Sequence, residues 1–326
     1  MPRGPLSDTA SPANTAAVPR HPDWFGALLV LLSATAFSAK AIFVKLAYNH
    51  PVDALTLLTL RMAFALPLFL LIAWWAGRAA GKHRLTQREW ISVACLGLIG
   101  YYAASLLDFL GLQYVSAALE RLVLFLSPTF VVLFSALLFG YRVGRRDIFA
   151  LAVCYLGIVL VFANDVSASQ SNVALGTGLV FLSALCYAGY LVGAGQMVTR
   201  IGSLRFAAYA SIISSIAIFA HFGITRDLRL LAQPAPVLWL SLVMAVVSTV
   251  LPVILMAEGM RRIGSSNASM LSSIGPIATI CMGAVFLGEP ISLIQLAGAF
   301  LVLAGVLAIS LKKKAVAQPL NQIENP

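Results

Sequence analysis

The chain has 326 residues, of which 60% are hydrophobic and only 10% are charged, and its mean hydropathy is +0.92. A water-soluble domain does not need so apolar a composition, so we expect most of the chain to lie in a lipid bilayer. The net charge of +10 comes from basic residues between the apolar segments, which favours anionic lipid, and not nucleic acid, as the partner of this charge.

Runs of about 20 apolar residues recur along the chain, each long enough to cross roughly 30 Å of hydrocarbon. Backbone groups in lipid must be satisfied within each segment, so every run is predicted to be a helix. The ten predicted spans are 24–47, 53–76, 90–111, 117–139, 148–164, 174–198, 204–222, 237–258, 266–287 and 291–311. The predicted fold class is therefore an all-α polytopic membrane protein.

The basic residues predict how the spans are oriented. If the N-terminus is cytoplasmic, the loops on that side hold most of the arginines and lysines, whereas the opposite loops hold only Arg226 and Arg229. This positive-inside bias predicts that both termini are cytoplasmic. The predicted location is the plasma membrane, which is the inner membrane if the cell is bacterial.

Segment 259–310 repeats segment 111–162 at residues that shape the backbone. The matched pairs are Gly111 and Gly259, Pro128 and Pro276, Gly140 and Gly288, and Gly157 and Gly305. A duplicated unit of five spans inserts upside-down relative to its twin, so we expect two inverted five-helix repeats around a central cavity. The predicted parts are a disordered tail at 1–22, a first repeat at 23–164, a linker at 165–173, a second repeat at 174–311 and a basic tail at 312–326. A cleaved signal at the N-terminus is the alternative for the first span.

Two lysines lie in the first span. Lys45 is close enough to the outer end to reach the membrane interface, whereas Lys40 lies more than a full helical turn deeper. An ionisable group at that depth usually faces the bundle interior or a watery cavity, so Lys40 is a candidate for substrate binding. Arg61 in the second span also needs a partner or water. Its charge could hold neighbouring helices together or could contact the substrate, and the sequence favours neither.

The third and fourth spans carry further polar residues. Tyr101, Ser105 and Asp108 follow Gly97 at helical spacing, which predicts one polar stripe that lines a cavity. Glu120 and Arg121 are adjacent and therefore point to different sides of their helix. Either could pair with Arg61 or Asp108, and the sequence leaves this open. Pro128 and Pro276 are predicted to kink the fourth and ninth spans.

In the second half, Tyr187 and Tyr190 share a face with Ser183, and packing and cavity lining are equally good accounts of them. Glu258 is expected to pair with the nearby Arg261 or Arg262. Ser273 belongs to a group of small polar residues that favours tight helix packing first and ligand contact second.

Glu289 is expected to be structural, near the N-terminus of the tenth helix, where the dipole favours a negative charge. The four cysteines lie on four different spans without metal-like spacing, and no glycine-rich phosphate loop is present in the sequence. We therefore expect no metal and no cofactor, and no direct use of ATP.

From about residue 24 to residue 311 the chain resembles the EamA-like branch of the drug/metabolite transporter superfamily. The residues that carry the resemblance are Lys45, Pro51 and Arg61, the run Gly111–Leu112–Gln113–Tyr114–Val115–Ser116–Ala117–Ala118, Pro128 before Gly140, and Pro276 before Gly288–Glu289. Two departures are Tyr141–Arg142, where the family usually has an acidic residue, and Ser or Ala near 210–211, where the first half has Arg61. The resemblance implies ten helices, inverted repeats and export of small metabolites, notably amino acids, with aromatic ones among them.

This resemblance suggests a mechanism. A zwitterionic amino acid needs a cation for its carboxylate and an acceptor for its ammonium, and Lys40 and Asp108 would supply both. The expected substrate-binding residues are Lys40, Tyr101, Ser105, Asp108, Tyr187, Tyr190 and Ser273. The expected structural or coupling residues are Lys45, Arg61, Glu120, Arg121, Pro128, Glu258 and Pro276.

Several alternatives stay open at this point. The cargo could be another drug or metabolite, and the chain could instead form a channel. A membrane-embedded lipid-modifying enzyme is disfavoured because the sequence has no cluster of Asp or His at a membrane edge. Proton coupling and facilitated diffusion are both open, as is the oligomeric state, for which a monomer is plausible.

Overall fold

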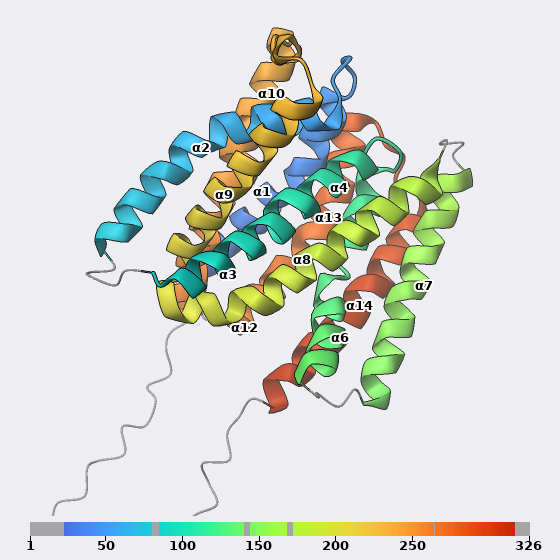
Figure 1. The fold of residues 1–326 in the computed structure, drawn as a ribbon. Helices are drawn as coiled ribbons and strands as arrows, with labels where there is room; N and C mark the ends of the chain where they lie inside the picture. The colour runs from blue at the N-terminus through green and yellow to red at the C-terminus, as the bar shows by residue number, and fades with distance from the viewer. Residues whose placement is uncertain (1–22, 80–84, 140–143, 168–171, 264, 317–326) are drawn as a thin grey trace, which may run out of the picture.

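The computed structural model describes residues 23–79, 85–139, 144–167, 172–263 and 265–316, and every regular element in these ranges is a helix (Figure 1). The α-helices are α1 (Trp24–Ala47), α2 (Ala54–Ala79), α3 (Gln87–Gly97), α4 (Ala104–Gly111), α5 (Ala117–Leu124), α6 (Ser127–Phe139), α7 (Arg145–Ser167), α8 (Val173–Ile201), α9 (Ser203–Thr225), α10 (Ala235–Ala245), α11 (Leu251–Ile263), α12 (Ser265–Leu271), α13 (Gly275–Met282) and α14 (Leu293–Val316). Shorter segments join some of them: the π-helical η1 (Leu98–Ala103), η3 (Val246–Val250) and η5 (Gly283–Leu287), and the 3₁₀-helical η2 (Leu228–Leu231) and η4 (Ser272–Ile274).

Eight helices in the described part of the chain are long and apolar enough to cross a membrane. They are Trp24–Ala47, Ala54–Arg78, Gln87–Gly111, Ala117–Phe134, Ile148–Val166, Val173–Gly195, Ser203–Thr225 and Ala235–Ile263. These match the first eight predicted spans, and shorter apolar helices, Ser272–Leu287 and Leu293–Leu307, stand at the ninth and tenth. Large apolar side chains such as Leu137, Phe149 and Phe300 are exposed on the outside, where lipid would cover them. The chain is a multi-pass membrane protein.

The helices pack in a bundle in which α1 contacts elements from both halves of the chain. It packs against α5, α10, α11, α12 and α13. Helix α2 packs on α9 and α10, α4 packs on α8, and α7 lies along α14 at one edge of the molecule (Figure 1). The centre of the bundle is therefore built around α1, the helix that carries Lys40.

Two of the matched glycines make closely similar contacts. A Cβ atom on Gly111 of α4 would lie 2.5 Å from Cγ2 of Val180 in α8, and one on Gly259 of α11 would lie 2.5 Å from Cγ2 of Val30 in α1. Real Cβ atoms do not approach so closely, so both positions need glycine for space. A glycine thus allows close packing of α4 on α8, and the matched glycine allows close packing of α11 on α1.

The contact between α7 and α14 also depends on small residues. A Cβ atom on Gly157 would lie 2.5 Å from the carbonyl oxygen of Gly298, and one on Gly305 would lie 2.6 Å from the carbonyl oxygen of Ala150. Small residues allow helix backbones to approach closely in a membrane, where dispersion and not water exclusion drives helix association.

Pro128 and Pro276 stand at interruptions of the fourth and ninth spans, the points at which the sequence predicted kinks. Helix α5 ends at Leu124, and Pro128 lies in the first turn of α6. Helix α12 gives way to η4, and Pro276 is the second residue of α13. Proline lacks an N–H and clashes with the preceding turn, but it is well tolerated in the first turn of a helix.

The predicted linker is shorter than expected, because α7 continues through Ser167 and therefore includes residues 165–167. Asp165 is not solvated but buried, and its Oδ2 accepts a hydrogen bond of 3.0 Å from the backbone N–H of Ser116. The predicted tail at 1–22, residues 317–326 of the basic tail, and the departure at Tyr141–Arg142 lie outside the described residues.

Candidate functional site

Lys40, Asp108 and Glu120, from α1, α4 and α5, meet inside the bundle and form what we call the charged cluster. The Lys40 Nζ lies 2.5 Å from Oδ2 of Asp108 and 3.0 Å from Oε1 of Glu120. The lysine side chain is 16% exposed, whereas those of Asp108 and Glu120 are 3% and 0% exposed. One ammonium therefore holds two buried carboxylates, and the cluster has one negative charge in excess when all three groups are ionised.

Local structure explains why the two carboxylates face one lysine. The hydroxyl of Ser116 accepts a hydrogen bond from the backbone N–H of Leu119 and so caps α5, which places Glu120 in the first turn, where the helix dipole favours it. Asp108 lies in the last turn of α4, where the dipole is unfavourable, so it depends on Lys40. Among the described residues, Oδ1 of Asp108 and Oε2 of Glu120 have no hydrogen-bond partner.

The sequence left open which charged residues of the third and fourth spans pair with each other, and the structure shows these pairs. Both Asp108 and Glu120 pair with Lys40, and not with an arginine. Arg61 is buried on α2, and its guanidinium carbon lies 4.8 Å from the centre of the Phe109 ring. This cation–π contact stabilises a charge whose Nε has no hydrogen-bond partner in the described part of the chain.

Aromatic side chains from η1, α8 and α9 form a second group, the aromatic cluster of Tyr101, Tyr187, Tyr190 and Phe206. The Tyr190 ring stacks on Tyr187 at 5.6 Å and on Phe206 at 5.8 Å, and it meets the edge of Tyr101 at 5.2 Å. Tyr190 is buried and Tyr187 is 39% exposed, so Tyr190 is a packing residue and Tyr187 is the accessible one. Phe206 and Gly100 were not predicted for this cluster, and a Cβ atom on Gly100 would lie 2.3 Å from Cγ of Tyr190.

The predicted polar stripe does not line a single surface. Gly97 lies against Ala210 of α9, Tyr101 contacts Tyr190 of α8, and Asp108 binds Lys40 of α1. The reason is the π-helical segment η1, because its wider turn changes the register between the residues before and after it. The other two candidates, Ser105 and Ser273, are partly exposed, on α4 and in η4.

Near the end of α1, Lys45 lies within electrostatic range of Glu289 and Asp165, and both carboxylates bind the N-terminus of α5. Oε1 of Glu289 accepts a hydrogen bond of 3.1 Å from the N–H of Ala117, and Asp165 binds the preceding N–H. Burial raises the pKa of Glu289, and the Ala117 N–H and Lys45 oppose that shift. Glu289 is structural, as expected, but its carboxylate binds the start of α5, while Ser292 caps α14.

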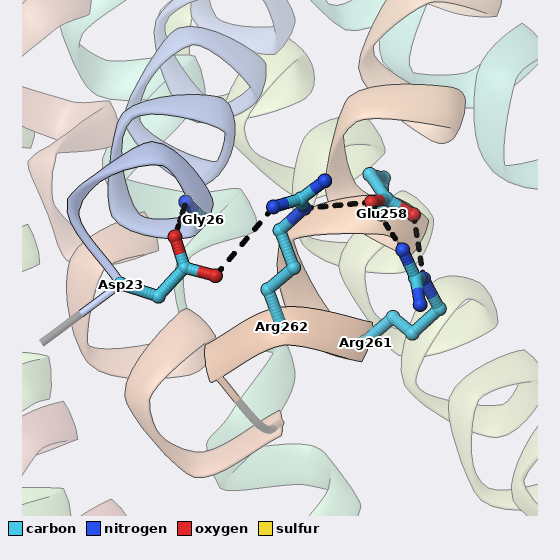
Figure 2. Close-up of polar contacts among 5 residues, drawn as sticks. All are labelled: Asp23, Gly26, Glu258, Arg261 and Arg262. Carbon is cyan, nitrogen blue, oxygen red and sulfur yellow. Dashed lines mark hydrogen bonds and ion pairs between the residues drawn. The ribbon is translucent and has the colours of Figure 1, made fainter. Parts of the chain in front are cut away.

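At the other end of α1, an ion-pair group joins α1 to α11 (Figure 2). Glu258 accepts hydrogen bonds from Arg261 at 2.6 Å and from Arg262 at 2.7 Å, which confirms the predicted pairing. Arg262 also lies 3.6 Å from Asp23, whose other oxygen accepts from the N–H of Gly26 and caps α1. Arg261 is exposed and the other three side chains are about one-third exposed, so these ion pairs fix the position of the two helix ends more than they stabilise the fold.

Comparison with known proteins decides the family. The model of the EamA-like transporter family matches residues 24–163 and again residues 174–311. The chain belongs to the EamA-like transporter family. It is therefore a membrane transporter of the EamA type, as the sequence motifs predicted.

Three relatives show how broad the family is. An uncharacterized transporter, YcbK, of Bacillus subtilis (strain 168) is 34% identical over 289 residues, which are 86% of this chain and 92% of the relative. The pseudopaline exporter CntI of Pseudomonas aeruginosa (strain UCBPP-PA14) is 25% identical over 89% of this chain and 97% of its own. The S-adenosylmethionine/S-adenosylhomocysteine transporter of Chlamydia muridarum (strain MoPn / Nigg) is 27% identical over 64% of this chain and 68% of its own.

Proposed function

We propose that this EamA-family transporter is a secondary carrier that exports small metabolites across the plasma membrane by alternating access. Amino acids with apolar or aromatic side chains are the favoured cargo. The observation that carries the proposal is the charged cluster, in which the single ammonium of Lys40 contacts two buried carboxyl groups. The accessible Tyr187 lies within electrostatic range of that lysine.

The chemistry of the cluster fits a substrate with a positive group. An ammonium entering the site takes up the carboxylate charge that Lys40 leaves unbalanced, and the unpartnered oxygens of Asp108 and Glu120 accept its hydrogen bonds. Tyr187 then offers its ring to the substrate side chain, a contact worth about 0.5–1.5 kcal/mol. Ser105 and Ser273, which are partly exposed, are the further polar groups assigned to the lining.

The relatives support a small metabolite as cargo. One is named a transporter of S-adenosylmethionine and S-adenosylhomocysteine, and both molecules carry an α-amino-acid group. Another is named a pseudopaline exporter, which supports the outward direction.

Two inverted halves of five spans, with both termini cytoplasmic, are part of this proposal. Three observations support them: the distribution of basic residues, the match of the family model to each half, and the equivalent contacts of Gly111 and Gly259. Rocking of the halves would open the site first to one side and then to the other.

Counterflow of L-phenylalanine in reconstituted vesicles tests the cargo and the site together. The isosteric variant Asp108→Asn removes an acceptor of the ammonium, so we expect at least a tenfold loss of flux. Asp227→Asn, at an exposed loop residue, is the matched control and is expected to transport like the wild type. Equal flux in Asp108→Asn and the wild type would refute the assignment, and flux that does not saturate would favour a channel.

An imposed pH gradient separates the two modes of energy coupling. Proton antiport requires that the gradient drive accumulation, because a proton then replaces the substrate ammonium at the charged cluster. Facilitated diffusion predicts that the gradient leaves the initial flux unchanged.

A further inference from the structure

The side chain of Arg121 occupies a space that exists because residue 275 is glycine. A Cβ atom on Gly275 would lie 2.6 Å from Nη2 of Arg121 and 3.2 Å from its Nε. The φ angle of Gly275 is −50°, a value that any residue adopts, so the glycine is needed for room and not for backbone conformation. The guanidinium therefore lies against the first turn of α13, directly after the interruption in the ninth span.

The neighbours of this guanidinium leave its Nε without an acceptor among the described residues. The nearby hydroxyl of Ser38 donates its hydrogen to backbone carbonyls, including that of Gly275 at 3.0 Å. The Nε atom of Arg121 is buried and has no hydrogen-bond partner among the residues that the structure describes. A guanidinium has five N–H donors and no acceptor, and leaving donors unpaired away from water is costly.

The acidic groups in electrostatic range of Arg121 pair with Lys40 and make no hydrogen bond to the Arg121 Nε. Glu120 and Asp108 are its acidic electrostatic neighbours, but both are bonded to Lys40. The site thus separates its charge into a negative part, the charged cluster, and a positive part, Arg121. This polarity is that of a receptor for a zwitterion, with the ammonium at one part and the carboxylate at the other.

We propose that Arg121, whose guanidinium is accommodated by the missing side chain of Gly275, binds the carboxylate of the transported amino acid, and that Lys40 does not. The inference rests on the proposed function and gives the substrate an orientation. The Lys40 ammonium is held by two carboxylates, whereas the Arg121 guanidinium presents the planar donor pair that matches a carboxylate. The Tyr187 hydroxyl lies within electrostatic range of both cations, which places this accessible ring beside the bound substrate.

Ligands with and without the carboxylate test the inference. Competition against L-phenylalanine counterflow is measured with L-phenylalanine, with its methyl ester and with phenethylamine. The wild type is expected to bind the amino acid at least tenfold more tightly than the other two. In Arg121→Gln this preference is expected to vanish, through weaker binding of phenylalanine and with unchanged binding of the ester and the amine.

Two further variants make the test independent of any folding defect in Arg121→Gln. Gly275→Ala keeps the charge but crowds the guanidinium, so it should weaken phenylalanine and spare the ester. Arg121→Lys should retain part of the preference, since it keeps a cation without the planar donor pair. Ligand-induced thermal stabilisation gives the same comparison for a variant that binds without transporting. Arg200→Gln, at an exposed residue near the end of α8, is the control and should match the wild type.

An Arg121→Gln protein that still prefers phenylalanine to its ester, or that loses both equally, overturns the inference while the proposed function stands. Wild-type vesicles that move no amino acid overturn both.

Discussion

At the scale of the residue, the charged cluster depends on Lys40, because its ammonium is the cation that contacts both carboxylates. The side chains that carry these carboxylates, Asp108 and Glu120, are buried. Their mutual repulsion and their desolvation are both offset by one positive charge. Removing that charge is therefore more disruptive than removing either carboxylate.

We expect Lys40→Met to destabilise the protein by about 3–5 kcal/mol, the range for breaking a buried ion pair by removing one partner. The triple variant Lys40→Met/Asp108→Asn/Glu120→Gln carries no charge in the cluster and should recover most of this loss. Thermal unfolding in detergent measures both. A triple variant as unstable as Lys40→Met would show that the lysine stabilises the bundle through packing and not through charge.

Depth in the membrane was enough to single out Lys40, because a lysine so far from the interface needs polar surroundings. Its partners were not predictable, since Asp108 and Glu120 come from other helices and the rotation of each helix about its axis decides what they face. Gly100 and Gly275 were missed for a related reason. What matters at these positions is the side chain that fills the space, Tyr190 and Arg121 respectively, and this side chain lies far away in the sequence.

At the scale of the element, apolar length predicted where the helices lie but not how they are interrupted. The prolines marked both interruptions in the fourth and ninth spans, although a break and a kink leave the same pattern in the sequence. The π-helical segment within the third span has no proline in it or in the turn that follows, whereas Pro252 lies two residues after the one in the eighth span. The binding of Glu289 to the start of α5 also has no marker in the sequence, because it joins residues 172 positions apart.

The close helix contacts lead to a prediction for four glycines. Alanine at Gly111 or Gly259 places a methyl group 2.5 Å from a valine of the neighbouring helix, and such overpacking costs about 1–3 kcal/mol. Alanine at Gly178 or Gly195 of α8 meets nothing within 4 Å and is expected to be neutral or to stabilise by up to about 1 kcal/mol, because alanine is the better helix former. Thermal melting of the four single variants in detergent makes the comparison.

Equal melting temperatures for the two pairs of variants would contradict the close-contact account. A loss at Gly111 without a loss at Gly259 would contradict the equivalence of the two contacts. A double variant, Gly111→Ala/Gly259→Ala, should show additive losses because the two sites share no contact.

At the scale of the whole molecule, composition predicted a multi-pass helical protein and the motifs predicted its family, and both predictions are confirmed. These properties follow from average hydropathy and from a few residues that shape the backbone, so they need no knowledge of side-chain contacts. The direction of each half in the membrane stays a prediction. This direction is set by the charge of the loops relative to the two sides of the bilayer, and the contacts between helices do not determine it.

Cysteine labelling tests this direction most sharply at equivalent places in the two halves. Asn49 lies after α1 and Arg200 lies at the end of α8, which are the connections after the first span of each half, and both residues are exposed. Inverted halves place these connections on opposite sides of the membrane, whereas parallel halves place them on the same side.

With Cys95, Cys154, Cys186 and Cys281 replaced by alanine, Asn49→Cys should react with a membrane-impermeant maleimide in intact cells. Arg200→Cys should react only after permeabilisation, and Asp227→Cys, in the second half, should behave like Asn49→Cys. Labelling of both Asn49→Cys and Arg200→Cys from one side would leave the halves parallel and remove the basis for alternating access.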